Sequence, residues 1–142
     1  MSEPRVRRID SEREMLALGA RLAAELRGGQ VITLSGDLGA GKTTLVRGVL
    51  RGLGFEGRVK SPSYGLVETY ELDGLTVHHL DLYRLGDSVE LDFLGLEDLL
   101  GEGSVVLVEW PERAASRLPR PDRRVAIDID GSLRRVVVDK PD

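Results

Sequence analysis

Eight consecutive residues in the first third of the chain have the types and spacing of a phosphate-binding loop. Positions 36–43 read Gly-Asp-Leu-Gly-Ala-Gly-Lys-Thr and match the pattern G-x-x-x-x-G-K-[S/T] in full. Glycines allow backbone N–H groups to surround a phosphate with no Cβ in the way. Lys42 can reach the β- and γ-phosphates of a nucleotide, and the Thr43 hydroxyl can bind Mg²⁺. The motif predicts a nucleoside triphosphate site; the alternative is an ordinary glycine-rich turn between a strand and a helix.

Two carboxylates follow apolar runs that read as strands. Asp81 comes after LTVHHL, and Glu109 comes after SVVLV. Ligands of α/β sheets bind at the carboxyl ends of strands, and the metal beside a phosphate loop needs such a carboxylate. Either residue alone could simply mark the end of a strand, but both together favour a metal-dependent site. We expect Glu109 at the metal with Thr43, and Asp81 at the attacking water or in the outer shell of the metal.

Several polar or aromatic residues near these carboxylates are open to two interpretations. The segment 61–64, Ser-Pro-Ser-Tyr, is either a nucleotide-sensing switch or a turn. Arg84 and Arg113 either contact the nucleotide or are solvated at the surface. Trp110 is expected in the core, which is the common fate of a lone tryptophan. The adjacent His78 and His79 alternate on an expected strand, so at least one should be buried or paired, and neither is assigned a role.

The elements that must position these residues alternate between helical and strand-like patterns. A capping box at Ser11 and Glu14 begins an amphipathic helix that Gly28-Gly29 should end. We expect further helices over Thr43–Leu53, Asp87–Leu100 (with a Ser88 cap) and Pro111–Arg117, and strands over 30–35, Leu66–Leu72, Leu75–Asp81, 104–109, Arg124–Asp130 and Leu133–Asp139. This order predicts an α/β fold of three layers, P-loop NTPase-like, with a mixed, partly parallel central sheet and two β-hairpins. The strand order cannot be read from the pattern.

Length and composition narrow the class of protein. The 142 residues suit one domain, with 41% hydrophobic residues and no apolar run long enough to cross a membrane. The absence of a secretory signal and of cysteine suits the cytoplasm and excludes disulfides and thiolate metal sites. The net charge of −4 argues against binding nucleic acid mainly through counterion release. No guanine-reading N-K-x-D motif is present, which favours ATP over GTP.

Taken together, the motifs resemble the TsaE family. The segments GDLGAGKTTLVRGVLRGLG, SPSYGLVETY, HHLDLYRL and VEWPER occur in the order and spacing of that family, and the match runs from about residue 9 to residue 113. The family is the P-loop ATPase of the bacterial tRNA threonylcarbamoyladenosine pathway. The resemblance implies a cytoplasmic ATPase that works with the TsaD and TsaB proteins. Those partners modify adenosine 37 of tRNAs that read codons beginning with A, so tRNA is met only indirectly.

The resemblance also implies roles for particular residues. The phosphates would be held by Gly36, Asp37, Leu38, Gly39, Ala40, Gly41, Lys42, Thr43 and Thr44. Thr43 and Glu109 would hold Mg²⁺, with Asp81 as the other functional carboxylate beside them. The stretch around Asp10 and Ser11 would lie near the adenine, and Arg113 near the nucleotide. One departure from the family pattern is Ser63, where the family usually has threonine in S-P-T.

Two other functions fit parts of the sequence. A small-molecule kinase also begins with a phosphate loop, and the arginines from Arg117 to Arg124 could form its lid. Against a kinase, the loop is followed by a hairpin with no evident acceptor pocket between. A non-catalytic nucleotide sensor is the second alternative, and the presence of both Asp81 and Glu109 argues against it. The ATPase interpretation predicts slow turnover by the protein alone, because no arginine finger is secure in this chain.

Overall fold

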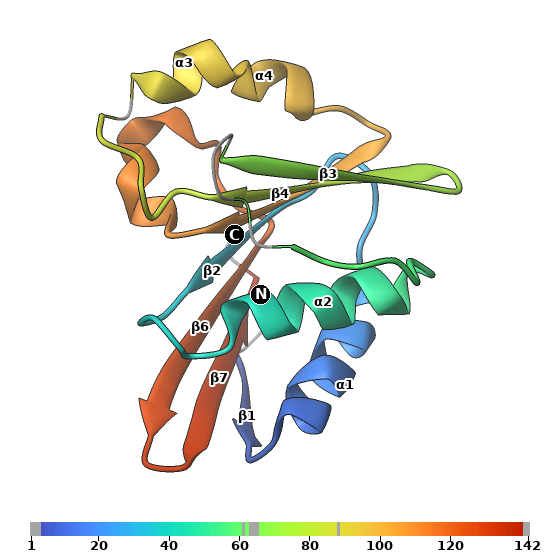
Figure 1. Ribbon diagram of the computed structural model, residues 1–142, viewed down its shortest axis with the longest axis vertical. Coiled ribbons are helices and arrows are strands. Elements are labelled where there is room, and N and C mark those ends of the chain that lie inside the picture. The colour runs from blue at the N-terminus through green and yellow to red at the C-terminus, as the bar shows by residue number, and fades with distance from the viewer. Residues whose placement is uncertain (1–3, 61, 63–65, 88, 141–142) are drawn as a thin grey trace.

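The computed structural model describes residues 4–60, 62, 66–87 and 89–140, and its strands form one seven-stranded sheet (Figure 1). The strands are β1 (Arg5–Ile9), β2 (Val31–Ser35), β3 (Val67–Leu72), β4 (Leu75–Asp81), β5 (Ser104–Glu109), β6 (Arg123–Asp130) and β7 (Leu133–Asp139). The helices are α1 (Glu12–Ala23), α2 (Lys42–Gly52), α3 (Glu90–Leu94), α4 (Leu96–Leu99) and the 3₁₀ helix η1 (Pro111–Arg117).

The sheet is mixed, with a parallel centre and antiparallel edges. Its order is β1-β7-β6-β2-β5-β4-β3, in which β6, β2, β5 and β4 run parallel to one another. The hairpins β3–β4 and β6–β7 and the pair β1–β7 are antiparallel. This confirms the expected mixed sheet and both hairpins. Because β2, β5 and β4 are parallel neighbours, their carboxyl ends lie at one edge of the sheet.

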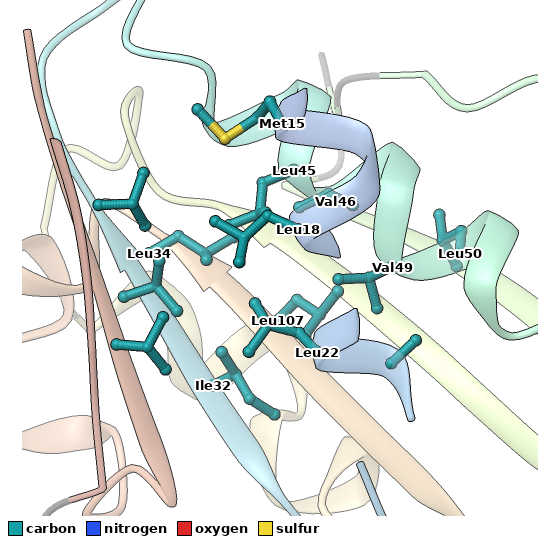
Figure 2. Packing of buried hydrophobic residues seen from close by; sticks show 14 of the residues in the cluster. Met15, Leu18, Leu22, Ile32, Leu34, Leu45, Val46, Val49, Leu50 and Leu107 are labelled. Carbon is teal, nitrogen blue, oxygen red and sulfur yellow. The ribbon is translucent and has the colours of Figure 1, made fainter. Parts of the chain in front are cut away.

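One face of the sheet is covered by α1 and α2. Figure 2 shows apolar side chains of both helices pointing at those of β2 and β5, and the labelled members of this cluster are Met15, Leu18, Leu22, Ile32, Leu34, Leu45, Val46, Val49, Leu50 and Leu107. The two helices approach closely because glycines lie where they meet: a Cβ at Gly48 would collide with the backbone of Leu16, and one at Gly19 with the backbone of Leu45. This packing holds the first turn of α2 at the carboxyl end of β2.

The other face is covered by α3, α4 and η1, which gives the third layer (Figure 1). Its core joins β4 and β5 to the buried side chains Leu91, Leu96 and Ala114. The prediction of one helix over Asp87–Leu100 was wrong, because the segment forms two short helices separated by Gly95 at φ +74°. A left-handed residue ends a helix, and glycine adopts this conformation without strain. The expected Ser88 cap lies outside the described residues.

Two other elements differ from expectation. Strand β1 was not predicted, because only Ile9 of its five residues is buried and the others give no apolar alternation. It exists by pairing with β7, a partner that a local pattern cannot indicate. Helix α1 ends at Ala23, before Gly28-Gly29, although Leu26 still packs against the core. Among the described residues, no helix combines the length and hydropathy that crossing a bilayer requires.

Candidate nucleotide site

The predicted phosphate loop connects β2 to α2 and is shaped by its glycines. Gly36, Gly39 and Gly41 have φ values of +154°, +82° and +113°. A Cβ at Gly36 would lie 2.6 Å from the carbonyl oxygen of Ile127, so the loop passes directly against β6. Helix α2 begins with Gly41 as its N-cap, no side chain caps it, and its first turn holds no acidic residue. The start of a helix of this kind is where backbone N–H groups can bind an anion.

Lys42 is buried at the base of this loop. Its ammonium donates a hydrogen bond to the carbonyl oxygen of Gly36 and lies 3.8 Å from the centroid of the Trp110 ring. Burial lowers the pKa of Lys42, and the carboxylates of Glu109 and Asp81 partly oppose that shift. A ligand that brings negative charge into the site would favour the charged ammonium.

The two expected carboxylates are neighbours across the sheet. Asp81 on β4 is the register partner of Glu109 on β5. The Thr43 hydroxyl donates to the Oε2 of Glu109 over 3.2 Å, and the Nε2 of His79 lies 2.5 Å from the same oxygen. The Oδ1 of Asp81 accepts a hydrogen bond of 3.0 Å from the backbone N–H of Tyr83. Burial raises the pKa of Asp81, so its environment disfavours the ionised form.

The Thr43 and Glu109 side chains could supply part of the coordination shell of a Mg²⁺ ion, but not all of it. The described residues contain no cluster of three or more His, Cys, Asp or Glu side chains that could form a complete metal site. Mg²⁺ commonly takes one or two protein oxygens and completes its shell with water and substrate phosphates. The Thr43 hydroxyl and the Glu109 carboxylate supply such oxygens beside the loop. The donor set therefore suits a magnesium ion that arrives with a nucleotide.

Two cavities flank the loop and share Gly39, Gly41 and Thr44. The first, of about 330 Å³, is also lined by Leu38, Lys42, Thr43, Asp81, Tyr83, Glu109 and Trp110. The second, of about 350 Å³, is also lined by Ile9, Asp10, Ser11, Glu12, Met15, Ala40, Ser132 and Arg134. Both are in the size range of small-molecule sites. Lys42, Thr43 and Glu109 line the first cavity, and Ser11 and Arg134 line the second.

The structure brings most of the expected site residues together around these cavities. Ser11 lies at the second cavity, where its hydroxyl also caps α1 by accepting from the N–H of Glu14 over 3.1 Å. Asp37 is exposed, and its carbonyl accepts from the N–H of Ala40 within the loop. Trp110 is half-buried and lines the first cavity, in addition to packing against the core.

Other expected residues lie elsewhere. Arg113 is exposed and lines neither cavity, and its guanidinium carbon is 5.7 Å from the centroid of the Tyr83 ring. Two of the arginines considered as a kinase lid are engaged elsewhere: Arg117 pairs with Asp92, and Arg123 is buried and donates to the carbonyl of Glu25. The Ser-Pro-Ser-Tyr switch cannot be placed, since Ser61, Ser63 and Tyr64 lie outside the described residues.

Sequence reasoning missed two residues at the site. His79 is fully buried on β4 and contacts Glu109, whereas His78 contacts the Thr69 hydroxyl over 2.9 Å. The placement of His79 two residues before Asp81 was an available signal, because alternate residues of a strand share a face. Arg134 on β7 contacts the loop, and no local pattern pointed to it.

Comparison with known proteins identifies one family. The family model described as threonylcarbamoyl adenosine biosynthesis protein TsaE matches residues 9–137. The tRNA threonylcarbamoyladenosine biosynthesis protein TsaE of Haemophilus influenzae is 44% identical over 133 residues, which cover 90% of this chain and 84% of that protein. The protein of the same name from Bacillus subtilis is 35% identical, covering 96% and 85%. The crystal structure of Bacillus subtilis YdiB aligns with a TM-score of 0.81 at 31% identity, covering 97% of this chain and 86% of that one.

Proposed function

The chain belongs to the TsaE family, and from this premise we propose that it binds Mg·ATP in the two cavities beside the 36–43 loop and hydrolyses it. The observation that carries the proposal is the contact between Thr43 and Glu109. These side chains are 66 residues apart in sequence and 3.2 Å apart in space, at the uncapped start of α2. A hydroxyl and a carboxylate at that position are the protein oxygens that a nucleotide-bound magnesium requires.

Each part of the site has a distinct task in this proposal. The N–H groups at the start of α2 and the Lys42 ammonium bind the phosphates. Thr43 and Glu109 hold Mg²⁺, which when bound neutralises part of the phosphate charge. Asp81 orients the attacking water, because it lies beside Glu109 and lines the same cavity. The nucleoside occupies the second cavity, against the residues where β1 meets α1.

Hydrolysis by this protein alone is expected to be slow. Phosphoryl transfer is accelerated mainly by positioning and by added positive charge. Within the described part of the chain, the first cavity is lined by Lys42 and by no arginine, and Arg113 and Arg84 are exposed elsewhere. We therefore propose that TsaD and TsaB complete the site, and that the ATPase serves threonylcarbamoyladenosine formation at position 37 of tRNA. The names of the relatives support the pathway.

The test is ATP turnover by the purified protein, with and without the TsaB–TsaD pair from the same source. We expect low turnover alone and an acceleration of about 10³–10⁵-fold if a partner contributes an arginine. A folded Thr43→Ala variant should lose the Mg²⁺-dependent part of nucleotide binding, and Thr69→Ala, which removes a hydroxyl that lines neither cavity, should not. Absence of ATP binding by the wild-type protein would reject the nucleotide site. Rapid hydrolysis that the pair does not alter would reject the role of the partners.

A further inference from the structure

Arg134 connects the C-terminal hairpin to the phosphate loop. From its position on β7, its Nε donates to the carbonyl oxygen of Ala40 over 3.2 Å, and its Nη2 donates to that of Gly39 over 3.4 Å. Its Nη1 donates to the carbonyl of Leu133 over 3.2 Å. Among the described residues, no carboxylate pairs with this guanidinium, so its hydrogen-bonding fork is directed at loop carbonyls.

These contacts act on the peptide planes that bind phosphate. In a trans peptide the C=O and the following N–H point in opposite directions. Holding the Ala40 carbonyl toward β7 therefore turns the N–H of Gly41 away from the hairpin. Holding the Gly39 carbonyl likewise orients the N–H of Ala40, which donates to the carbonyl of Asp37 over 3.0 Å.

The planes need such a constraint because glycines flank them. Gly39 and Gly41 have φ values of +82° and +113°, and glycine crosses between backbone regions at little steric cost. Backbone sterics therefore restrict the peptide planes between them little; the Ala40 N–H is held by Asp37 within the loop, and the two carbonyls are held from outside the loop. Arg134 holds them, since two of its nitrogens contact two successive carbonyls.

We propose that Arg134 is a positioning residue, which fixes the peptide planes of the loop so that the N–H of Gly41 is presented to the phosphates before a nucleotide arrives. The loop then loses less conformational entropy when the nucleotide binds, and its affinity for the phosphate part of the ligand is higher. This inference rests on the proposed function. It gives the C-terminal hairpin, which lies outside the 36–43 motif, a role in nucleotide binding.

The experiment measures the binding of the phosphate part and of the nucleoside part of the nucleotide separately. Affinities for ADP, inorganic pyrophosphate and adenosine are measured by calorimetry for the wild type, Arg134→Ala, Arg134→Lys and the neighbouring control Arg135→Ala. Arg135 is exposed, and its guanidinium lies 3.8 Å from the Asp128 carboxylate. Because hydrogen bonds of charged groups are the strong ones, we expect Arg134→Ala to weaken ADP and pyrophosphate by roughly tenfold to a hundredfold. Adenosine binding should weaken less than ADP and pyrophosphate binding, because Arg134 contacts the loop carbonyls but also lines the cavity proposed for the nucleoside, and the control should resemble the wild type.

Each other outcome overturns the inference. If adenosine and ADP weaken together and pyrophosphate does not, Arg134 contacts the nucleoside directly. If Arg134→Lys binds like the wild type, charge alone suffices, because one ammonium cannot reproduce the two-point contact of a guanidinium. Unchanged binding by every variant removes any role for Arg134. Urea unfolding of the unliganded variants checks that each is folded. Wild-type protein that binds no ADP would reject the proposed function itself, a result distinct from all of these.

Discussion

The imidazole Nε2 of His79 lies 2.5 Å from the Oε2 of Glu109, and both side chains are buried, at 0% and 3% exposure. The same carboxylate oxygen accepts the Thr43 hydroxyl. With the carboxylate as acceptor, Nε2 carries the proton, and the buried Nδ1 has no partner among the described residues. Glu109 is therefore held through one oxygen by donors from β4 and α2, and its orientation is determined before any ligand binds.

The first prediction concerns the dependence of Glu109 on His79. Replacing His79 with leucine should lower the free energy of unfolding by about 1–3 kcal/mol, because the buried Glu109 carboxylate loses one of its two donors. It should also reduce ATP turnover, because Glu109 is no longer oriented. His79→Gln keeps an N–H donor and should retain more of both properties. Urea unfolding and an ATPase assay measure the two effects.

His78 provides the matched control for that experiment. It is adjacent in sequence, points to the other face of the strand and contacts Thr69. His78→Gln should change stability without changing turnover per folded molecule. Equal loss of turnover in the two glutamine variants would show that the effect comes from disturbing β4 as a whole.

The second prediction separates the roles of the two carboxylates. Glu109→Gln should weaken nucleotide binding in the presence of Mg²⁺ and leave the metal-free affinity nearly unchanged, because Glu109 contacts the Thr43 hydroxyl, with which we propose that it holds the metal. Asp81→Asn should bind nucleotide normally and lose turnover. Titration of both variants with ATP, with and without Mg²⁺, makes the comparison. The opposite pattern would mean that the two roles are exchanged.

The third prediction is that the ionised carboxylate of Asp81 lowers the free energy of unfolding at neutral pH. Burial raises its pKa in the folded protein, so the folded state binds this proton more tightly than the unfolded state does. The free energy of unfolding therefore falls as pH rises through the folded-state pKa. Asp81→Asn cannot ionise, and its amide oxygen can still accept the N–H of Tyr83. At pH 7 we expect the Tm of Asp81→Asn to be a few degrees above that of the wild type. Each kcal/mol of added stability raises Tm by about 2–4 °C in a chain of this size.

The pH dependence supplies the control for this third prediction. Wild type and Asp81→Asn should converge in Tm below about pH 3, where aspartate is protonated in both the folded and the unfolded state of the wild type. A difference in Tm that persists unchanged at low pH would assign the effect to packing and not to charge. Calorimetric scans between acid and neutral pH give both curves.

The fourth prediction uses the lone tryptophan as a reporter. The Lys42 ammonium lies over the Trp110 ring, and phosphates that attract the ammonium would change the surroundings of the indole. Addition of ADP should therefore change Trp110 emission. Lys42→Ala should abolish most of that change and reduce turnover by roughly 10²–10³-fold, as expected for loss of one charged stabilising contact. Unchanged hydrolysis by a folded Lys42→Ala protein would refute the phosphate-loop assignment.

Much of the site could be predicted from the sequence because its chemistry is local. The loop motif occupies contiguous residues, three of its glycines have positive φ values, and Lys42 contacts the carbonyl oxygen of Gly36 at the start of the loop. Asp81 and Glu109 were identified because a strand's apolar run indicates where that strand ends. The β3–β4 hairpin was likewise indicated by its own turn residues, Asp73-Gly74.

Local patterns failed where a partner distant in sequence decides the structure. The charged segment Arg5–Ile9 becomes β1 only because β7 offers it an edge. The segment 87–100 has a helical pattern, but Gly95 adopts a left-handed conformation and divides it. His79 and Arg134 were assigned no role, although the position of His79 two residues before Asp81 was a usable signal. The contacts that distinguish them, of His79 with Glu109 and of Arg134 with two carbonyls of the loop, join elements that are distant in sequence.

The sequence by itself thus determined the phosphate loop, the strand-end carboxylates and the alternation of helices and strands, because each depends on residues close together in the chain. The tertiary structure decided which of these groups meet. Placing β5 beside β2 and β4 beside β5 brings Thr43, Glu109 and Asp81 to one edge of the sheet. Strand order depends on the packing of the whole core, and no single segment of the sequence indicates how side chains that are distant in the chain pack together.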